Sequence, residues 1–323
     1  MSLKVPRLPL AEGAADRVLR ELGITKLPID PKEIAALKEI KVEAAPATIK
    51  GFSGMLAQWD TNFGIMYATH INSIGFQRFS IAHELGHYFI PGHMEQVLAN
   101  GAHTSHAGFG SRDPYEQEAD FFASALLMPS SLIRPIIARQ DDGLDLVKTI
   151  AQECVTSLTA SAVRYARMSR SAVAVVLSEG GVIDFCLFSE AMKEAKVRWP
   201  RAGSPLPAGS LTRRFGADRA NVASAREDSG QADLIDWFDC PKSHVVSEGV
   251  IGLGTYGKTL TVLYSARLTA EVEGLDEEDE DEKLEESWTP RFRHLKVVAD
   301  VGNLDGRSLR RPSEIASIFR NNA

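Results

Sequence analysis

The sequence has few of the features that mark a secreted, membrane-spanning or disulfide-stabilised protein. Its 323 residues include only three cysteines, Cys154, Cys186 and Cys240, which are odd in number and far apart. They exclude a disulfide framework and a four-cysteine metal site. The longest apolar run, 172–177, is far shorter than the roughly 20 residues of a spanning helix. The first residues lack an apolar segment followed by a cleavage site, so we expect a soluble cytoplasmic protein with no membrane contact.

An excess of charge is confined to one segment. The net charge is −7, and residues 276–286 alone hold nine acidic residues and one lysine, which leaves about +1 for the rest. Like charges at this density repel each other and bury nothing, so we expect a solvated linker over 271–290, followed by a C-terminal tail over 291–323. The remaining chain has no basic excess, and composition therefore does not indicate a nucleic-acid-binding protein.

Length and periodicity predict about two domains with a mixed α+β fold. The first part is mostly helical, and the part after residue 170 alternates as strands do. Asp30 is a suitable N-cap for the first short helix, because Pro31 follows it at the first helical position. The predicted helices are 32–37, 79–90, 115–127, 144–151 and 158–167; the predicted strands are 63–68, 172–177, 182–188, 244–253 and 259–264; and a loop is predicted over 93–113.

The strongest chemical signal is the segment His83-Glu84-Leu85-Gly86-His87 within the helix predicted at 79–90. Two histidines four residues apart project from one face of a helix, so both ring nitrogens can reach one zinc ion. Glu84 then lies beside the metal, where it can take a proton from water as a general base. The pattern predicts a zinc site with His83 and His87 as ligands and Glu84 as the catalytic base.

A catalytic zinc site needs a third protein ligand, for which the sequence offers three candidates. Glu116 is favoured, because Asp120 lies four residues later on the same face and can accept a hydrogen bond from a ligand histidine. Glu118 lies off that face and is expected to be exposed. His93 follows His87 by six residues, but Pro91-Gly92 places the turn late for a third histidine ligand.

Two motifs together resemble the ImmA/IrrE family of zinc metallopeptidases. The first is Arg78-Phe79-Ser80-Ile81-Ala82-His83-Glu84-Leu85-Gly86-His87, and the second is Glu116-Gln117-Glu118-Ala119-Asp120-Phe121-Phe122-Ala123-Ser124-Ala125-Leu126-Leu127-Met128-Pro129. The resemblance covers about residues 25–170. It implies His83, His87 and Glu116 as ligands, Glu84 as the base, and Asp120 at a position where the family tends to carry Asn or Asp. The long loop between the motifs, 88–115, departs from the family pattern.

The resemblance also implies a function and a domain order. Members act inside bacteria and cleave helix-turn-helix repressors, which releases stress-response or mobile-element genes. The expected order is a mostly helical zincin-like metallopeptidase domain over 1–130, a helix-turn-helix extension over 131–170, and a β-rich α+β domain over 171–270. By family analogy alone, the last domain is expected to resemble a GAF-like sensor.

Further contacts for a peptide substrate can be sought around the metal site. Three candidates for stabilising the carbonyl oxygen in the transition state, His103, His106 and Tyr115, lie in or beside the loop. A peptide also needs an unpaired strand edge, and the strand at 63–68 is our candidate for it.

Two other motifs are weaker indications of function, one for nucleotide binding and one for DNA binding. Residues 252–259 match a phosphate-binding loop, but the residues after it alternate as a strand rather than a helix, so we expect a hairpin turn and no nucleotide. The helix pair at 144–167 could contact DNA through Arg164, Arg167 and Arg170, but four nearby carboxylates offset them. Direct DNA binding is therefore possible and not favoured.

The sequence thus favours a zinc metalloendopeptidase whose partner is a helix-turn-helix repressor. The alternative is a regulator that binds DNA or a repressor without proteolysis, and a third hypothesis is a zinc hydrolase of small molecules. Mn²⁺ and Fe²⁺ are compatible with the same ligand set.

Overall fold

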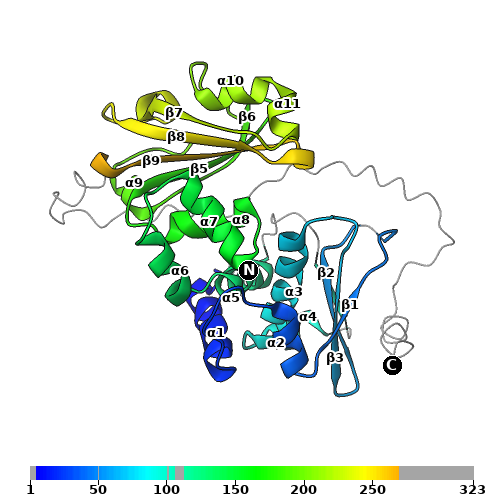
Figure 1. Cartoon of the computed structure of the whole chain (residues 1–323). Coiled ribbons are helices and arrows are strands. Elements are labelled where there is room, and N and C mark those ends of the chain that lie inside the picture. Colours follow the sequence, from blue (N-terminus) through cyan, green and yellow to red (C-terminus); the bar gives the residue numbers. More distant parts are fainter. Residues whose placement is uncertain (1–4, 50, 100–101, 106–112, 269–323) are drawn as a thin grey trace. The chain divides into compact units, whose positions relative to one another are not determined.

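The computed structural model describes residues 5–49, 51–99, 102–105 and 113–268, and these residues form two compact units (Figure 1). The first unit contains the described residues up to Leu132 and also Glu153–Ser157. The second contains Ile133–Gln152 and the described residues from Leu158 onward. The described chain has 13 helices, one of them a 3-10 turn, and two β-sheets, which confirms the expected α+β class. The linker and the tail predicted over 271–323 lie outside the described residues.

The first unit packs helices against one face of a four-stranded sheet. The strand order is β1-β3-β2-β4, in which β1 pairs with β3 in parallel and the other pairs are antiparallel. Leu56 and Ile65 belong to the main core with the helices, whereas their neighbours Met55 and Met66 belong to a smaller cluster. This alternation is what the pleat of a strand imposes. The elements are α1 Leu8–Glu21, α2 Pro31–Leu37, β1 Lys41–Ala44, β2 Gly54–Trp59, β3 Asn62–Tyr67, α3 Ile74–Phe89, α4 His93–Val97, β4 Ala102–Ser105 and α5 Pro114–Leu127.

Several expectations for this unit are confirmed and two are wrong. Asp30 caps α2 by accepting a hydrogen bond from the backbone N–H of Lys32, at 2.9 Å. The loop expected over 93–113 instead contains α4 and β4. The strand at 63–68 is present as β3, but β3 lies between β1 and β2, so both of its edges are paired. It therefore cannot receive a substrate strand, and the expectation that it does is wrong; β4, which pairs only with β2 in the described sheet, lies at an edge.

The second unit is built on an antiparallel five-stranded sheet with the order β6-β5-β9-β8-β7. The strand β5, which lies between β6 and β9, is buried along almost its whole length, and α8 packs against it, whereas α10 and α11 pack against β8 (Figure 1). The four predicted strands are confirmed as β5, β6, β8 and β9. The elements are α7 Leu144–Cys154, α8 Leu158–Met168, β5 Ala172–Glu179, β6 Val182–Phe188, α9 Glu190–Glu194, α10 Leu211–Ala217, α11 Arg219–Ala223, β7 Glu227–Asp233, α12 Leu234–Trp237, β8 Val245–Gly252, a 3-10 turn Gly254–Tyr256 and β9 Thr259–Ser265; α6 Ser130–Ile137 spans the boundary between the units.

The glycine-rich segment at 252–259 is a turn between two strands. It joins β8 to β9 through the 3-10 turn, with Gly254 and Gly257 at positive φ. The strand predicted after it is confirmed, so no helix N-terminus is available there to hold a phosphate. Lys258, the residue that would contact a phosphate, instead lies 2.6 Å from the carboxylate of Asp184.

Helices α7 and α8 occupy the two ranges predicted to be helical. Contacts of α8 with β5, β6 and β9 bury one of its faces, and Arg164 on that face is 2% exposed. Arg164 is therefore not available to contact a DNA phosphate, which weakens the DNA-binding interpretation of this helix pair.

Hydropathy identifies no single helix in the described chain that is long and apolar enough to cross a membrane. The pair α5 and α6, bent by 60°, reaches the required length and composition only when the two helices are taken together.

Candidate metal centre

Helix α3 places two histidines on one buried face. Ser73 caps this helix by accepting a hydrogen bond from the backbone N–H of Phe76, at 3.3 Å, so the helix starts five residues earlier than the sequence pattern predicted. Both His83 and His87 are buried, with 6% and 0% of their surface exposed. Their Nε2 atoms are 3.1 Å apart, as the spacing of one helical turn predicted.

Helix α5 brings a carboxylate to the same point. The helix begins at Pro114 and is capped by Asp113, whose side chain accepts from the backbone N–H of Tyr115 at 2.9 Å. This start places Glu116 in the first turn, with its Oε2 3.4 Å from His83 Nε2 and its Oε1 3.2 Å from His87 Nε2. The structure therefore brings together the three residues that were expected to be ligands.

The spacing of these three donors fits a metal ion. Donor atoms held at about 2.0–2.1 Å from a tetrahedral zinc lie about 3.3 Å apart. The separations here are 3.1, 3.2 and 3.4 Å, and the three side chains form a group that could hold a metal ion. His83, His87 and Glu116 thus have the geometry of three ligands on one ion.

The chemistry of the donor set also fits a cation. His83 Nδ1 donates to the Asp120 carboxylate at 2.8 Å, so Nδ1 keeps its proton and Nε2 is the atom whose lone pair becomes available to a metal ion when the ion displaces a proton from it. Burial lowers the pKa of His87 to about 3, so its ring is neutral. Lone pairs from both rings and the Glu116 carboxylate then converge on one point, an arrangement that a divalent cation stabilises. The identity of the ion is not fixed by this geometry.

Glu84 lies beside this centre with one oxygen held and the other unpaired. Its Oε1 accepts from Ser105 Oγ at 2.7 Å, and its Oε2 is buried with no hydrogen-bond partner among the described residues. A Cβ on Gly54 in β2 would lie 2.5 Å from Oε1, so the absence of a side chain there makes room for the carboxylate. Burial raises the pKa of Glu84 to about 6. A carboxylate with a free oxygen and a raised pKa is suited to accept and release a proton near neutral pH.

The candidates for oxyanion contacts differ in position. His103 on β4 donates from Nε2 to Glu116 Oε1 at 2.8 Å, so it lies next to the centre. The ring of Tyr115 packs edge-on against His93, at 5.0 Å between centroids. His106 lies outside the described residues.

His93 and Glu118, the two alternative ligands, lie next to His87 and are not part of the group that could hold a metal ion. His93 is fully buried, and its Nδ1 lies 3.1 Å from His87 Nδ1. Glu118 is 2% exposed and accepts from His93 Nε2 at 3.0 Å, so the expectation that Glu118 is exposed was wrong. Burial raises the pKa of this carboxyl, but hydrogen bonds from Arg7 and His93 outweigh it and hold the pKa below the usual value.

Arg7 and Ser105 are two residues near the centre that the sequence analysis did not identify. Arg7 is the more distant of the two in sequence from the residue it contacts. It precedes the first turn of α1 and donates to Glu118 from its backbone N–H at 2.8 Å and from Nη2 at 2.8 Å. The two residues are 111 positions apart in the sequence, and no local pattern around Arg7 indicates the contact.

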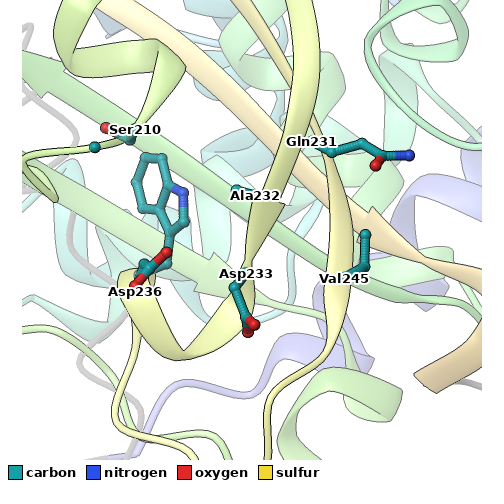
Figure 2. A pocket seen from close by; sticks show the side chains of 8 residues that line it. Ser210, Gln231, Ala232, Asp233, Asp236 and Val245 are labelled. Carbon is teal, nitrogen blue, oxygen red and sulfur yellow. The ribbon is translucent and has the colours of Figure 1, made fainter.

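One pocket of the second unit contains none of these residues. It has a volume of about 270 Å³, and Asp233, Asp236 and Val245 are among its lining residues (Figure 2). Asp233 accepts from the backbone N–H groups of Ile235 and His244, at 3.2 and 3.1 Å, so its carboxylate stabilises local structure.

Comparison with known proteins gives a match to one family model and matches to solved structures. The family model of peptidase M78, described as the IrrE N-terminal-like domain, matches residues 48–166. A solved structure described as a Mycobacterium tuberculosis transcriptional regulator has a TM-score of 0.50 and 14% identity, covering 83% of this chain and 81% of its own. At that identity it is similar in fold alone. No curated protein matches the chain.

The matched range contains the whole candidate metal centre, with His83, His87 and Glu116, and the neighbouring Glu84. Its description confirms the resemblance seen in the sequence, and the family points to a peptidase. Residues 48–166 match the IrrE N-terminal-like domain of this family, which supports an ImmA/IrrE assignment for this part of the chain.

Proposed function

We propose that this protein is a zinc-dependent endopeptidase of the cytoplasm that cleaves a helix-turn-helix transcriptional repressor. The observation that carries the proposal is the convergence of His83, His87 and Glu116 on one point, with the unpaired Oε2 of Glu84 beside it. The repressor as substrate, and the release of stress-response or mobile-element genes, rest on the family resemblance.

Each side chain around the centre has a chemical task in this proposal. His83, His87 and Glu116 hold the ion, which supplies Lewis acidity to the scissile carbonyl when bound. Glu84 takes a proton from the attacking water through Oε2 and passes it to the leaving amine. Ser105 fixes the other oxygen of Glu84. His103 donates from Nε2 to Glu116 Oε1, and donation from the same N–H to the carbonyl oxygen as its charge develops would replace this contact.

The rest of the chain has a proposed place in this function. Strand β4 carries His103 and pairs only with β2 among the described strands, so its other edge is the candidate surface for an extended peptide. We assign residues 1–130 to a zincin-like peptidase domain and 131–170 to a helix-turn-helix extension. Residues 171–270, which include the antiparallel sheet, would form a GAF-like regulatory domain, 271–290 a linker and 291–323 a tail.

The experiment compares Glu84→Gln with the wild type. We expect about one zinc per chain in both proteins by elemental analysis, and cleavage of a repressor encoded beside the gene by the wild type alone. The expected loss of rate is on the order of 10²–10⁴, the usual contribution of a general base. Glu95→Gln, which changes an exposed carboxylate on α4, is the matched control.

A second candidate function is a regulator that binds without cleaving, since the solved structure with a similar fold is described as a transcriptional regulator. This alternative predicts that Glu84→Gln regulates its target as the wild type does. Gel shifts with the upstream DNA and with the repressor separate the two functions. Cleavage that persists in Glu84→Gln would remove Glu84 from the mechanism.

A further inference from the structure

A continuous chain of hydrogen bonds runs from the surface of the first unit to one candidate ligand. Arg7 donates to both oxygens of Glu118, from Nε to Oε1 at 3.1 Å and from Nη2 to Oε2 at 2.8 Å. Glu118 Oε2 lies 3.0 Å from His93 Nε2, and His93 Nδ1 lies 3.1 Å from His87 Nδ1. Four residues from four parts of the chain are thus linked in series, and only Arg7, with 49% of its side chain exposed, reaches solvent.

The direction of each hydrogen bond follows from the carboxylate. Glu118 paired with a guanidinium is ionised and can only accept, so His93 Nε2 must carry a hydrogen. Neutral His93 then presents a lone pair at Nδ1, and His87 Nδ1 must be the donor to it. That tautomer leaves the lone pair of His87 at Nε2, the atom that faces Glu116.

We propose that His93, Glu118 and Arg7 are positioning residues that fix the tautomer and ring orientation of His87 and thereby set the affinity of the metal site. The inference rests on the metal site of the proposed function; it adds Arg7 and His93, which lie outside the two family motifs, and gives a role to Glu118 within the second motif. Arg7 precedes the range matched by the family model, which starts at residue 48.

The two candidate histidine ligands are oriented by different hydrogen-bond partners. His83 donates directly to Asp120, which lies one helical turn after Glu116 on α5. His87 has no direct carboxylate partner at Nδ1 among the described residues and reaches Glu118 through the ring of His93. Such outer partners commonly set metal affinity within about 10–100-fold.

Substitutions at His93 separate positioning from packing. His93→Leu removes both hydrogen bonds, so we expect zinc affinity to fall by about 10–100-fold. His93→Gln keeps a carbonyl oxygen that can accept from His87 and an amide that can donate to Glu118, so we expect it to recover most of that loss. Affinity is measured by competition with a chromophoric chelator, and the unfolding temperature in EDTA reports the fold of the metal-free proteins.

Arg7 provides a second test, because its half-exposed side chain can be removed without opening the core. We expect Arg7→Ala to weaken zinc binding in the same direction as His93→Leu but less, since its backbone N–H still donates to Glu118. Arg20→Ala, which removes an exposed arginine from α1, is the matched control.

Two results would overturn the proposal. One is equal zinc affinity in Arg7→Ala and Arg20→Ala, which decides the question even where His93→Leu does not fold. The other is an equal loss in His93→Leu and His93→Gln, which would assign His93 to packing. The proposed function is tested separately, because a wild type that binds zinc and cleaves no repressor refutes proteolysis without changing this comparison of affinities.

Discussion

Gly86 in α3 lies directly against Ala119 in α5. A Cβ at Gly86 would lie 3.1 Å from the Cα of Ala119 and 3.2 Å from its carbonyl oxygen. The absence of a side chain at Gly86 therefore lets the two helix backbones approach closely. This approach sets the distance between the histidines of α3 and the carboxylate of α5.

Gly86→Ala should consequently weaken both the fold and the metal site. Overpacking of a core contact costs about 1–3 kcal/mol, and α5 must move away from α3 to relieve it. Urea denaturation and zinc competition measure the two effects. Gly13→Ala is the control, since Gly13 lies in α1 with no described atom within 4 Å of an added Cβ. Unchanged zinc affinity in Gly86→Ala would show that the contact does not position Glu116.

Zinc affinity should rise with pH because the ion must displace a proton from His83. Burial lowers the pKa of His83, but hydrogen bonds to Asp120 and Glu116 outweigh it and raise the pKa well above the usual value. Below that pKa the metal-free ring is protonated, and apparent affinity should fall by up to about tenfold per pH unit for each proton displaced.

Asp120→Asn tests the cause of this pH dependence. The amide oxygen can still accept from His83 Nδ1 but carries no charge, so the pKa of His83 falls and the loss of affinity should shift to lower pH. Chelator competition between pH 6 and pH 8 measures the shift. Identical curves of zinc affinity against pH for the wild type and Asp120→Asn would exclude Asp120 as the group that stabilises the protonated ring of His83.

Zinc should stabilise the first unit and leave the second unchanged. All three donors lie in the first unit, and a ligand at 100 times its dissociation constant adds about 2.7 kcal/mol to the state that binds it. Hydrogen exchange with and without zinc should therefore slow in α3 and α5 and stay constant in β5 and β9. An equal slowing of hydrogen exchange by zinc in α3, α5, β5 and β9 would contradict a site confined to the first unit.

Lys258 should contribute to stability and not to nucleotide binding. The side chains of Lys258 and Asp184 are 10% and 11% exposed, so Lys258→Met leaves a nearly buried carboxylate without its partner. Breaking such a pair costs on the order of 3 kcal/mol, whereas Lys242→Met at an exposed position should cost little. Thermal unfolding measures both effects. A rise in unfolding temperature with ATP in the wild type, absent in Lys258→Met, would restore the nucleotide hypothesis.

Helices and strands whose apolar residues repeat with a regular period were predictable from the sequence. The helix around His83 and His87 and the strands β5, β6, β8 and β9 were found at or near their predicted ranges, because one buried face imposes a repeat on the sequence. The strand β7, with the sequence Glu-Asp-Ser-Gly-Gln-Ala-Asp, was not predicted. It is an edge strand with an exposed surface, so its conformation depends on pairing with β8 rather than on an apolar pattern.

The sequence by itself determined the spacing of His83 and His87 and the place of Glu84 beside them, and it favoured Glu116 over Glu118 and His93 as the third candidate ligand, because Asp120 lies one helical turn after Glu116. Only the tertiary structure decided where Glu118 and His93 lie and which strands lie at the edges of the described four-stranded sheet. The reason is physical: burial and hydrogen-bond partners depend on contacts between segments such as Arg7 and Glu118, 111 residues apart, and the helical period of α5 carries no information about a partner that arrives from α1.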